Sequence, residues 1–213
     1  MNASFSKKEK IILGIVVLFY VVGVIGFSFT LTHALFTKLT PFILLLSLAF
    51  LAYHDRTENR KNLSFYFLFV FIASFLMEMA GTNTGVLFGE YAYGSGLGIK
   101  LWRTPLLIGV NWVLLVYMTA AVFAQKPQNG LYQIIFPTLL MVGYDIVMEQ
   151  IAAKMDMWYW VNGSIPLQNY AMWGALAVVF HVLKHFFNIH IVNKMAFPLF
   201  VVQVLFFLFI LMI

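Results

Sequence analysis

The sequence predicts an all-α fold, a polytopic membrane helix bundle with about seven transmembrane helices in a single integral-membrane domain over residues 1–213. The first observation is composition: 62% of the residues are hydrophobic and 10% are charged, whereas a soluble domain averages roughly 45–50% apolar and 25% charged residues. The second is that apolar stretches recur along the chain, each near the roughly 20 residues that a spanning helix needs. The third is that no polar segment is long enough to form a separate soluble domain.

Seven apolar stretches are the expected spans, and the second is the shortest. They are Ile11–Leu31, Thr37–Tyr53, Leu63–Ala80, Thr104–Ala124, Leu131–Ala152, Leu167–Phe187 and Ala196–Ile213. The first is too long for the apolar core of a signal peptide, and no small-residue cleavage site follows it. Thr104 is expected to cap the fourth helix, with Pro105 at its first position. Ile165 and Pro166 are expected to open the sixth helix in the same way.

A glycine-rich segment, Gly81–Gly98, follows the third expected helix and contains six glycines and three aromatic residues. It is too polar to span a bilayer and too apolar to extend freely into water. Irregular backbone at membrane depth is tolerated only where it is buried in protein or lines a cavity. We therefore expect an interfacial or re-entrant segment on the outer face.

Basic residues predict the orientation. With seven spans, nine of the 13 Lys and Arg residues lie on the side of the N-terminus, among them Lys126 between the fourth and fifth helices. The positive-inside rule then places the N-terminus in the cytoplasm, and we expect a bacterial inner (cytoplasmic) membrane protein. The net charge is +5, but the basic residues are scattered over short loops, so a nucleic-acid partner is not expected. The absence of Cys excludes a disulfide-stabilised scaffold.

Four polar or aromatic residues are expected at one depth in the bilayer. Counting the helical rise from the helix ends places Glu78, Asn111, Asp145 and Trp173 in the outer third of a core about 30 Å thick. Charged side chains inside a bilayer are costly and mark functional sites by default. The sequence offers no Lys or Arg at the depth of the two carboxyl groups, so a purely structural role would leave them unpaired.

A further acid lies close to Asp145. Glu149 follows it at i+4, so both side chains share one face of the fifth helix. Two like charges there are unfavourable, and at least one group is expected to keep its proton. A carboxylic acid kept neutral by apolar surroundings is a good general acid. Glu149 has a structural alternative, which is to reach the interface or pair with Lys154.

Several other polar or aromatic side chains have structural interpretations beside the functional ones. Trp158, Tyr159 and Trp160 are typical of an interfacial aromatic belt, or they contribute to a substrate site. Asn111 is either an interhelical hydrogen-bond partner or part of the site, and Asn169 is either a cap or part of it. Two basic residues of the sixth helix, His181 and Lys184, are expected to extend toward the cytoplasmic interface.

No motif of a soluble enzyme is present. There is no phosphate-binding loop, no dinucleotide-binding glycine pattern and no H-E-x-x-H. Five scattered histidines and no Cys argue against a zinc site, whose usual ligands are nitrogen and sulfur atoms. The seventh helix has no Lys that could form a Schiff base, which argues against a rhodopsin.

Four segments carry a recognisable pattern. Glu78 to Tyr93 reads E-M-A-G-T-N-T-G-V-L-F-G-E-Y-A-Y, and Pro105 to Trp112 reads P-L-L-I-G-V-N-W. The other two segments are G-Y-D-I-V-M-E, ending at Glu149, and W-Y-W-V-N-G-S-I-P-L-Q-N-Y-A-M-W, ending at Trp173. Together they resemble the carotenoid 1′,2′-hydratase family, membrane proteins of carotenoid biosynthesis that include the bisanhydrobacterioruberin hydratases. One departure is that the family tends to carry a second aspartate followed by proline where this chain has Glu149 and Gln150.

The resemblance implies addition of water to the terminal ψ-end double bond of an acyclic carotenoid such as lycopene. A carboxylic acid would protonate the alkene, aromatic faces would stabilise the tertiary cation, and water would capture it. Asp145 or Glu78 is the expected acid, with the other orienting water, and no cofactor or metal is needed. The candidate catalytic residues are Glu78, Asp145 and Glu149, and the candidate substrate-binding residues are Asn83, Tyr91, Tyr93, Asn111, Trp112, Trp160, Asn169 and Trp173.

Expected partners are the carotenoid substrate, the lipid bilayer and other carotenoid-biosynthesis enzymes. Three alternatives remain open. Intramembrane acids also serve proton-coupled transporters, although such carriers usually have broken helices in both halves. A carotenoid end-group cyclase would also protonate the end group and would then lose a proton instead of adding water. A non-catalytic membrane scaffold would leave the aligned acids unexplained.

Overall fold

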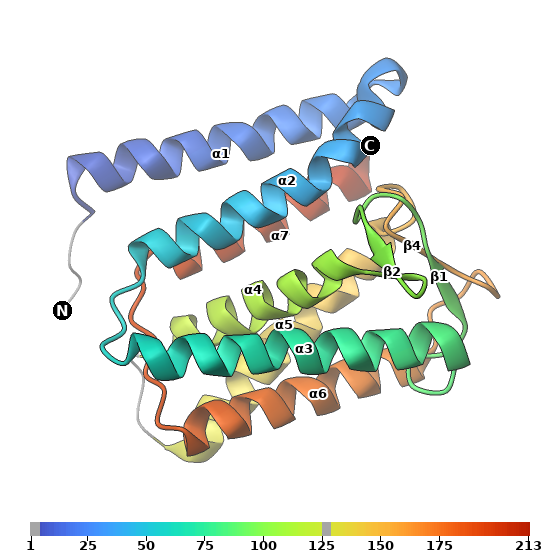
Figure 1. The fold of residues 1–213 in the computed structure, drawn as a ribbon. Coiled ribbons are helices and arrows are strands. Elements are labelled where there is room, and N and C mark those ends of the chain that lie inside the picture. Colours follow the sequence, from blue (N-terminus) through green and yellow to red (C-terminus); the bar gives the residue numbers. More distant parts are fainter. Residues whose placement is uncertain (1–4, 125–128) are drawn as a thin grey trace.

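The structure is a computed structural model that describes residues 5–124 and 129–213. Within these ranges the chain forms seven α-helices and four short β-strands (Figure 1). The helices are α1 (Lys7–Ser28), α2 (Thr30–His54), α3 (Arg60–Thr84), α4 (Leu106–Phe123), α5 (Gly130–Ile151), α6 (Leu167–Phe186) and α7 (Ala196–Met212). The strands are β1 (Tyr91–Tyr93), β2 (Lys100–Leu101), β3 (Thr104–Pro105) and β4 (Trp158–Trp160). The predicted all-α class is thereby confirmed.

Helix α4 forms the centre of the bundle. It packs against α2, α3, α5, α6 and α7, and every residue from 111 to 120 is buried. Helix α1 instead contacts α2 and α7 at one side of the bundle, where it lies apart from α3 and α6 (Figure 1). Much of its surface is exposed and apolar, as at Ile11, Leu18 and Ile25. An apolar outer surface of this kind is expected where the solvent is lipid.

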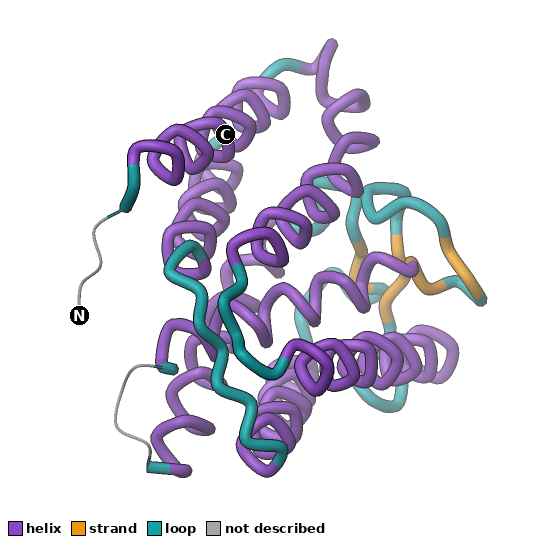
Figure 2. Tube along the Cα trace, turned by 60° about the vertical axis from the view of Figure 1, so that its left-hand side comes forward, coloured by secondary structure: helices purple, strands orange, loops and turns teal. Residues whose placement is uncertain are grey.

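Two small antiparallel sheets lie at one end of the bundle (Figure 2). In the first, β1 pairs with β4 in the register Tyr91 with Trp160 and Tyr93 with Trp158. This sheet joins the segment after α3 to the segment after α5. In the second sheet, β2 pairs with β3 across a two-residue turn in which Trp102 and Arg103 both have positive φ, the geometry that favours a tight hairpin.

Local signals explain several helix ends. Ser6 and Glu9 form a reciprocal capping box at the start of α1. Gly85 ends α3 in the left-handed conformation, with φ of 68°, and donates its backbone N–H to Gly81 O at 2.8 Å. Pro166 is the N-cap of α6 and has an extended conformation. The last two of these ends belong to α3 and α6, which carry candidate site residues.

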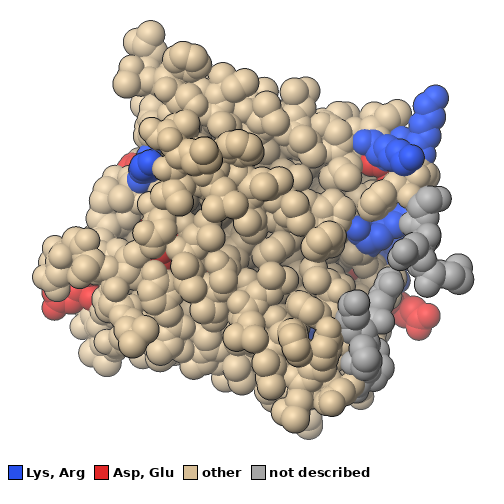
Figure 3. Space-filling view, turned by 180° about the vertical axis from the view of Figure 1, so that it is seen from behind, with Lys and Arg blue, Asp and Glu red and all other residues tan. Residues whose placement is uncertain are grey.

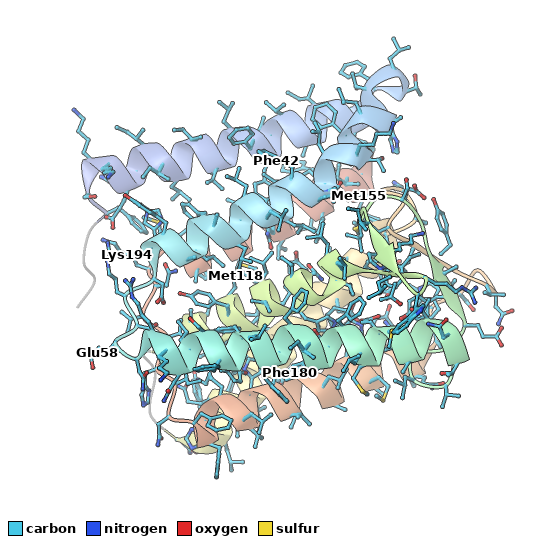
Figure 4. All side chains as sticks on the ribbon, viewed as in Figure 1. Phe42, Glu58, Met118, Met155, Phe180 and Lys194 are labelled. Atoms are coloured by element: carbon cyan, nitrogen blue, oxygen red, sulfur yellow. The ribbon has the colours of Figure 1, made fainter. Side chains whose placement is uncertain are left out.

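Five helices, α1 to α5, are long and apolar enough to cross a membrane, and α7 is a shorter apolar helix. Helix α6 is more polar, because it carries Gln168, Asn169, His181 and Lys184. Charged side chains gather mainly toward the two ends of the bundle, with a broad band of other residues between them (Figure 3). Glu58 and Lys194, labelled in Figure 4, lie at the end opposite the strands. This distribution is that of a polytopic helical membrane protein.

Three sequence-based expectations need correction. Gly81 to Thr84 belong to α3, so the irregular glycine-rich segment begins later and contains β1. Thr104 and Pro105 form β3, and α4 begins at Leu106 with Pro105 as its N-cap. His181 and Lys184 are 0% and 4% exposed, so they do not extend toward an interface. Lys126, used for the orientation, lies outside the described residues.

Candidate active site

Glu78 lies near the end of α3 with its side chain 3% exposed. Its Oε2 accepts hydrogen bonds from the hydroxyl groups of Tyr91 and Tyr93, both at 2.7 Å. Its Oε1 accepts a hydrogen bond from Trp112 Nε1 on α4 at 3.0 Å. Three donors from two separate segments therefore surround a single buried carboxyl group.

Strand β1 explains how two tyrosines reach the same carboxyl group. Alternate residues of a strand point to the same side, and Tyr91 and Tyr93 are buried while Ala92 between them is exposed. Gly81 permits the close approach of this segment to α3, because an added Cβ would lie 2.4 Å from the Phe88 ring and 3.3 Å from Tyr91 OH. Burial, followed by the nearby Glu78 carboxylate, raises the pKa of both tyrosines, so they remain hydrogen-bond donors.

Glu149 on α5 is held in a similar way. Its Oε2 accepts hydrogen bonds from Trp158 Nε1 at 3.0 Å and from Trp160 Nε1 at 2.8 Å. Its Oε1 accepts one from Asn169 Nδ2 on α6 at 2.8 Å. Trp158 and Trp160 are alternate residues of β4, as the two tyrosines are of β1. The β1–β4 sheet thus supplies two donors to each of two buried carboxyl groups.

Asp145, one helical turn before Glu149, has much poorer hydrogen bonding. Its side chain is fully buried, and its nearest donor is Asn169 Nδ2 at 3.5 Å from Oδ2. Its Oδ1 has no hydrogen-bond partner among the described residues. Glu149 does not pair with Lys154, whose ammonium group donates to the carbonyl oxygens of Ile210 and Leu211. The structural alternative of a Lys154 pair is therefore wrong.

A small cavity of about 10 Å³ lies between the carboxyl groups of Glu78 and Glu149. A buried water needs roughly 10–15 Å³ and two to four polar partners, so the cavity has the size for a single water molecule. Its lining comes from α3, α4, α5, α6 and both strands of the sheet. The lining residues are Glu78, Tyr91, Tyr93, Ile108, Glu149, Trp158, Trp160, Asn169 and Trp173.

Aromatic rings cover the same region. Trp112 and Trp173 are stacked, with centroids 4.1 Å apart and planes at 22°. Tyr91 packs against Trp160 at 5.3 Å, and Tyr93 meets the edge of Trp158 at 6.1 Å. Indole and phenol faces attract cations, so a positive charge formed here would be stabilised.

The loop that carries β4 is anchored by Asp156. It accepts a hydrogen bond from the backbone N–H of Ser95 at 2.9 Å, another from the Ser95 hydroxyl, and one from Tyr159 OH at 2.7 Å. Partial burial acts to raise the pKa of Asp156, but the hydrogen bonds from Ser95 and Tyr159 outweigh it and hold the pKa below its usual value. These contacts hold the loop of β4 against the segment that follows β1.

A much larger cavity, of about 300 Å³, lies between α1, α2, α5 and α7, toward the end of the bundle that carries the strands. Trp158 lines both this cavity and the small one. Asn111 lines the large cavity, where its Nδ2 contacts Met148 Sδ at 3.9 Å and no other acceptor among the described residues. The two spaces are therefore neighbours that share one indole ring.

The structure brings most of the predicted site residues together. Those that meet around the carboxyl cluster are Glu78, Tyr91, Tyr93, Trp112, Asp145, Glu149, Trp160, Asn169 and Trp173. Asn83 is not among them: it is exposed and donates to Met79 O and Trp102 O. Trp158 was not among the predicted substrate-binding residues, although Trp160 of the same W-Y-W segment was. Burial alternates between Trp158 and Tyr159 in the structure, but three consecutive aromatic residues show no such alternation in the sequence, so no sequence signal distinguishes Trp158.

No group of three or more His, Cys, Asp or Glu residues suited to a metal ion occurs in the described part of the chain. The search of curated proteins and the search of solved structures gave no significant match. One family model, described as carotenoid biosynthesis protein, matches residues 36–213 and so covers most of the chain, including every residue of the carboxyl cluster. The chain belongs to the carotenoid biosynthesis protein family.

Proposed function

We propose that this protein is a cofactor-independent carotenoid hydratase that adds water to the terminal ψ-end double bond of an acyclic carotenoid. The observation that carries the proposal is the cavity of about 10 Å³ between Glu78 and Glu149, with aromatic rings around it. A hydratase needs an acid, a place for one water and a surface that tolerates a cation. Family membership supports a substrate of the carotenoid class.

The three carboxyl groups suit different parts of this reaction. Three negative charges in one buried cluster repel each other, and no salt bridge to a cluster member is found among the described residues. Glu78 and Glu149 each accept three hydrogen bonds, which fits ionised carboxylates. Asp145, with an unpartnered Oδ1, can hold a proton without displacing a donor. We assign the proton donor to Asp145 and the orientation of water to Glu78, with Glu149 completing the water site.

The reaction balances without any further reactant. Asp145 transfers its proton to the less substituted carbon of the terminal double bond, which leaves a tertiary cation on the neighbouring carbon. The water oxygen forms the new C–O bond, and its surplus proton passes to a carboxylate of the cluster. The net change is one alkene plus one water to one tertiary alcohol. Met148, a flexible side chain in the wall of the large cavity, would move aside to let the end group reach Asp145.

We also propose the setting of this reaction. The whole chain, residues 1–213, would act as one integral-membrane domain in the bacterial inner membrane, with its N-terminus in the cytoplasm. The carboxyl cluster would then lie toward the outer face. Other carotenoid-biosynthesis enzymes would supply the acyclic polyene and use the alcohol.

The test is a product assay in a lycopene-producing bacterial host, with mass spectrometry of the extracted pigments. We expect a new pigment heavier by one water, and cells grown in ¹⁸O-labelled water should place the label in that pigment. Asp145→Asn, Glu78→Gln and Glu149→Gln should lose it. Glu90→Gln is the matched control, because Glu90 is an exposed acid in the segment beside β1.

Each alternative gives a different result. A cyclase would produce an isomer with unchanged mass, and a transporter would leave the pigments unchanged. If protein verified in the membrane gives no heavier pigment from lycopene or from a longer acyclic carotenoid, the hydratase proposal is wrong. If the label is absent from a heavier pigment, the oxygen does not come from water and the mechanism is wrong.

A further inference from the structure

The large cavity of about 300 Å³ reaches the outer surface of the bundle. Four of its lining residues are also well exposed on that surface: Phe19 and Val22 of α1 are 46% and 43% exposed, and Leu39 and Phe42 of α2 are 42% and 57% exposed. These four residues, here named the mouth, lie on two neighbouring helices. In a membrane bundle an apolar surface on these helices faces lipid rather than water. The cavity is therefore open to lipid between α1 and α2.

The interior of the cavity is built for an apolar ligand. Methionines at 148, 155 and 157, together with Leu97 and Trp158, form its inner wall, and methionine side chains adapt readily to an irregular ligand. Phe42 on α2 and Met155 near β4 both line the cavity, and both are labelled in Figure 4. The inner wall includes the same Trp158 ring that covers the carboxyl cluster.

Three polar side chains of the wall, Tyr20, Tyr144 and Gln203, are connected by hydrogen bonds. Gln203 Nε2 donates to Tyr20 OH at 2.9 Å, and Tyr144 OH donates to Gln203 Oε1 at 3.1 Å. Tyr20 OH and Ser47 Oγ are also 2.9 Å apart. Satisfied groups of this kind offer little to a polar ligand. Asn111 differs, because its amide has only the long sulfur contact among the described residues, and it lies at the inner wall.

The volume limits how much ligand can enter. Small-molecule pockets occupy roughly 300–1,000 Å³, so this cavity is at the lower bound. A linear carotenoid is comparable in length to the bilayer core of about 30 Å, which is far more than such a space encloses. Only one end of the polyene fits, while the remainder extends through the mouth into lipid.

We infer that the cavity is a polyene-binding tunnel, filled sideways from the bilayer through the mouth between α1 and α2, which admits one end of a carotenoid at a time. The inference rests on the proposed hydratase function for what happens at the inner wall, but the tunnel itself needs only an apolar linear ligand. It follows that a symmetric substrate is released after its first hydration and binds again for the second. The amide of Asn111 is placed to hydrogen-bond the new hydroxyl group as the product leaves.

Substitutions at the mouth test the tunnel directly. Val22→Trp and Leu39→Trp place a large ring in the opening. Val21→Trp and Leu35→Trp are matched controls on the same two helices, because Val21 is 47% and Leu35 is 55% exposed and neither lines the cavity. The probe is the methyl ester of a linear conjugated tetraene fatty acid, whose fluorescence is excited directly and followed by anisotropy with protein in lipid nanodiscs.

We expect the two mouth variants to weaken probe binding by about tenfold or more, because apolar burial and hence affinity are lost, while the controls stay within about twofold of the unchanged protein. Binding by the mouth variants at the unchanged strength would overturn the tunnel. Hydration rates in reconstituted vesicles separate the two proposals. Mouth-dependent probe binding without any hydrated pigment leaves the tunnel standing and refutes the hydratase. Hydration at the normal rate by both mouth variants refutes the tunnel and leaves the hydratase standing.

Discussion

Replacing Tyr93 with phenylalanine removes a single oxygen atom from the carboxyl cluster and leaves the ring in place. That hydroxyl donates to Glu78 Oε2 at 2.7 Å from a side chain that is 8% exposed. Tyr159 offers a matched control, because its hydroxyl also donates to a carboxylate at 2.7 Å, namely Asp156, but its side chain is 46% exposed. The two substitutions thus differ mainly in burial and in which carboxylate loses a donor.

The size of the effect follows from the hydrogen bond. A hydrogen bond to a charged group contributes about 1.5–3 kcal/mol. At 1.36 kcal/mol for each factor of ten, Tyr93→Phe should lower the hydration rate by about 10–150-fold if Glu78 orients the attacking water as a carboxylate. Tyr159→Phe should change the rate by about twofold at most, because its hydrogen bond is exposed to solvent and Asp156 does not belong to the carboxyl cluster.

The assay measures the rate of formation of the hydrated pigment in reconstituted vesicles, at saturating and at limiting carotenoid. We expect Tyr93→Phe to lower kcat with little change in KM, since Tyr93 contacts a carboxyl group and not the large cavity. Thermal unfolding of both variants controls for misfolding. Equal rates for Tyr93→Phe and the unchanged protein, with both folded, would refute the assignment of Glu78 to the water.

Four further outcomes are expected. Asp145→Asn should abolish hydration and leave the melting temperature almost unchanged, because the substitution affects only the 3.5 Å contact with Asn169. An active Asn variant would contradict the assignment of Asp145 as the acid. Trp173→Ala should destabilise the protein by about 3–5 kcal/mol, since its stacked partner Trp112 loses its cover, and chemical unfolding would measure this. A symmetric acyclic carotenoid should accumulate as the singly hydrated product before the doubly hydrated one, and simultaneous appearance of the second product would argue against release between steps. Asp156 has a pKa held below its usual value of 3.8. The hydrogen bonds to its carboxylate therefore stabilise the folded protein above that pH, and this stabilisation is lost as the pH falls through the lowered pKa. In acid unfolding, the stability of Asp156→Asn should depend less on pH below about pH 4 than that of the unchanged protein.

Helix geometry made the centre of the site predictable. The rise of 1.5 Å per residue placed Glu78, Asp145 and Trp173 at one depth, and the structure brings them to one cluster. The same geometry explains the error at Asn83, which is five residues after Glu78. At 3.6 residues per turn the two side chains point to different sides of α3, and Asn83 is exposed.

The sheet formed by β1 and β4 could not be predicted from the sequence. Strands β1 and β4 have three residues each and lie far apart in the chain, so no turn or periodic pattern connects them. Their pairing is what directs Trp158 and Trp160 to Glu149 instead of to an interfacial belt. The large cavity could not be predicted either, because it depends on how α1, α2, α5 and α7 pack rather than on any one helix.

The pairing of β1 with β4 has a consequence for how the protein matures. Glu78 and Glu149 each lie on a helix and take two of their three donors from the segment that follows that helix. The two segments are separated in the chain by α4 and α5. During synthesis α3 is complete long before Trp158 and Trp160 exist, so Glu78 must enter the bilayer before the sheet can form. The donors of both carboxyl groups come into register only when the second loop joins the first. The carboxyl cluster is therefore completed late in membrane insertion, and a chain interrupted before β4 holds Glu149 without its two indole donors.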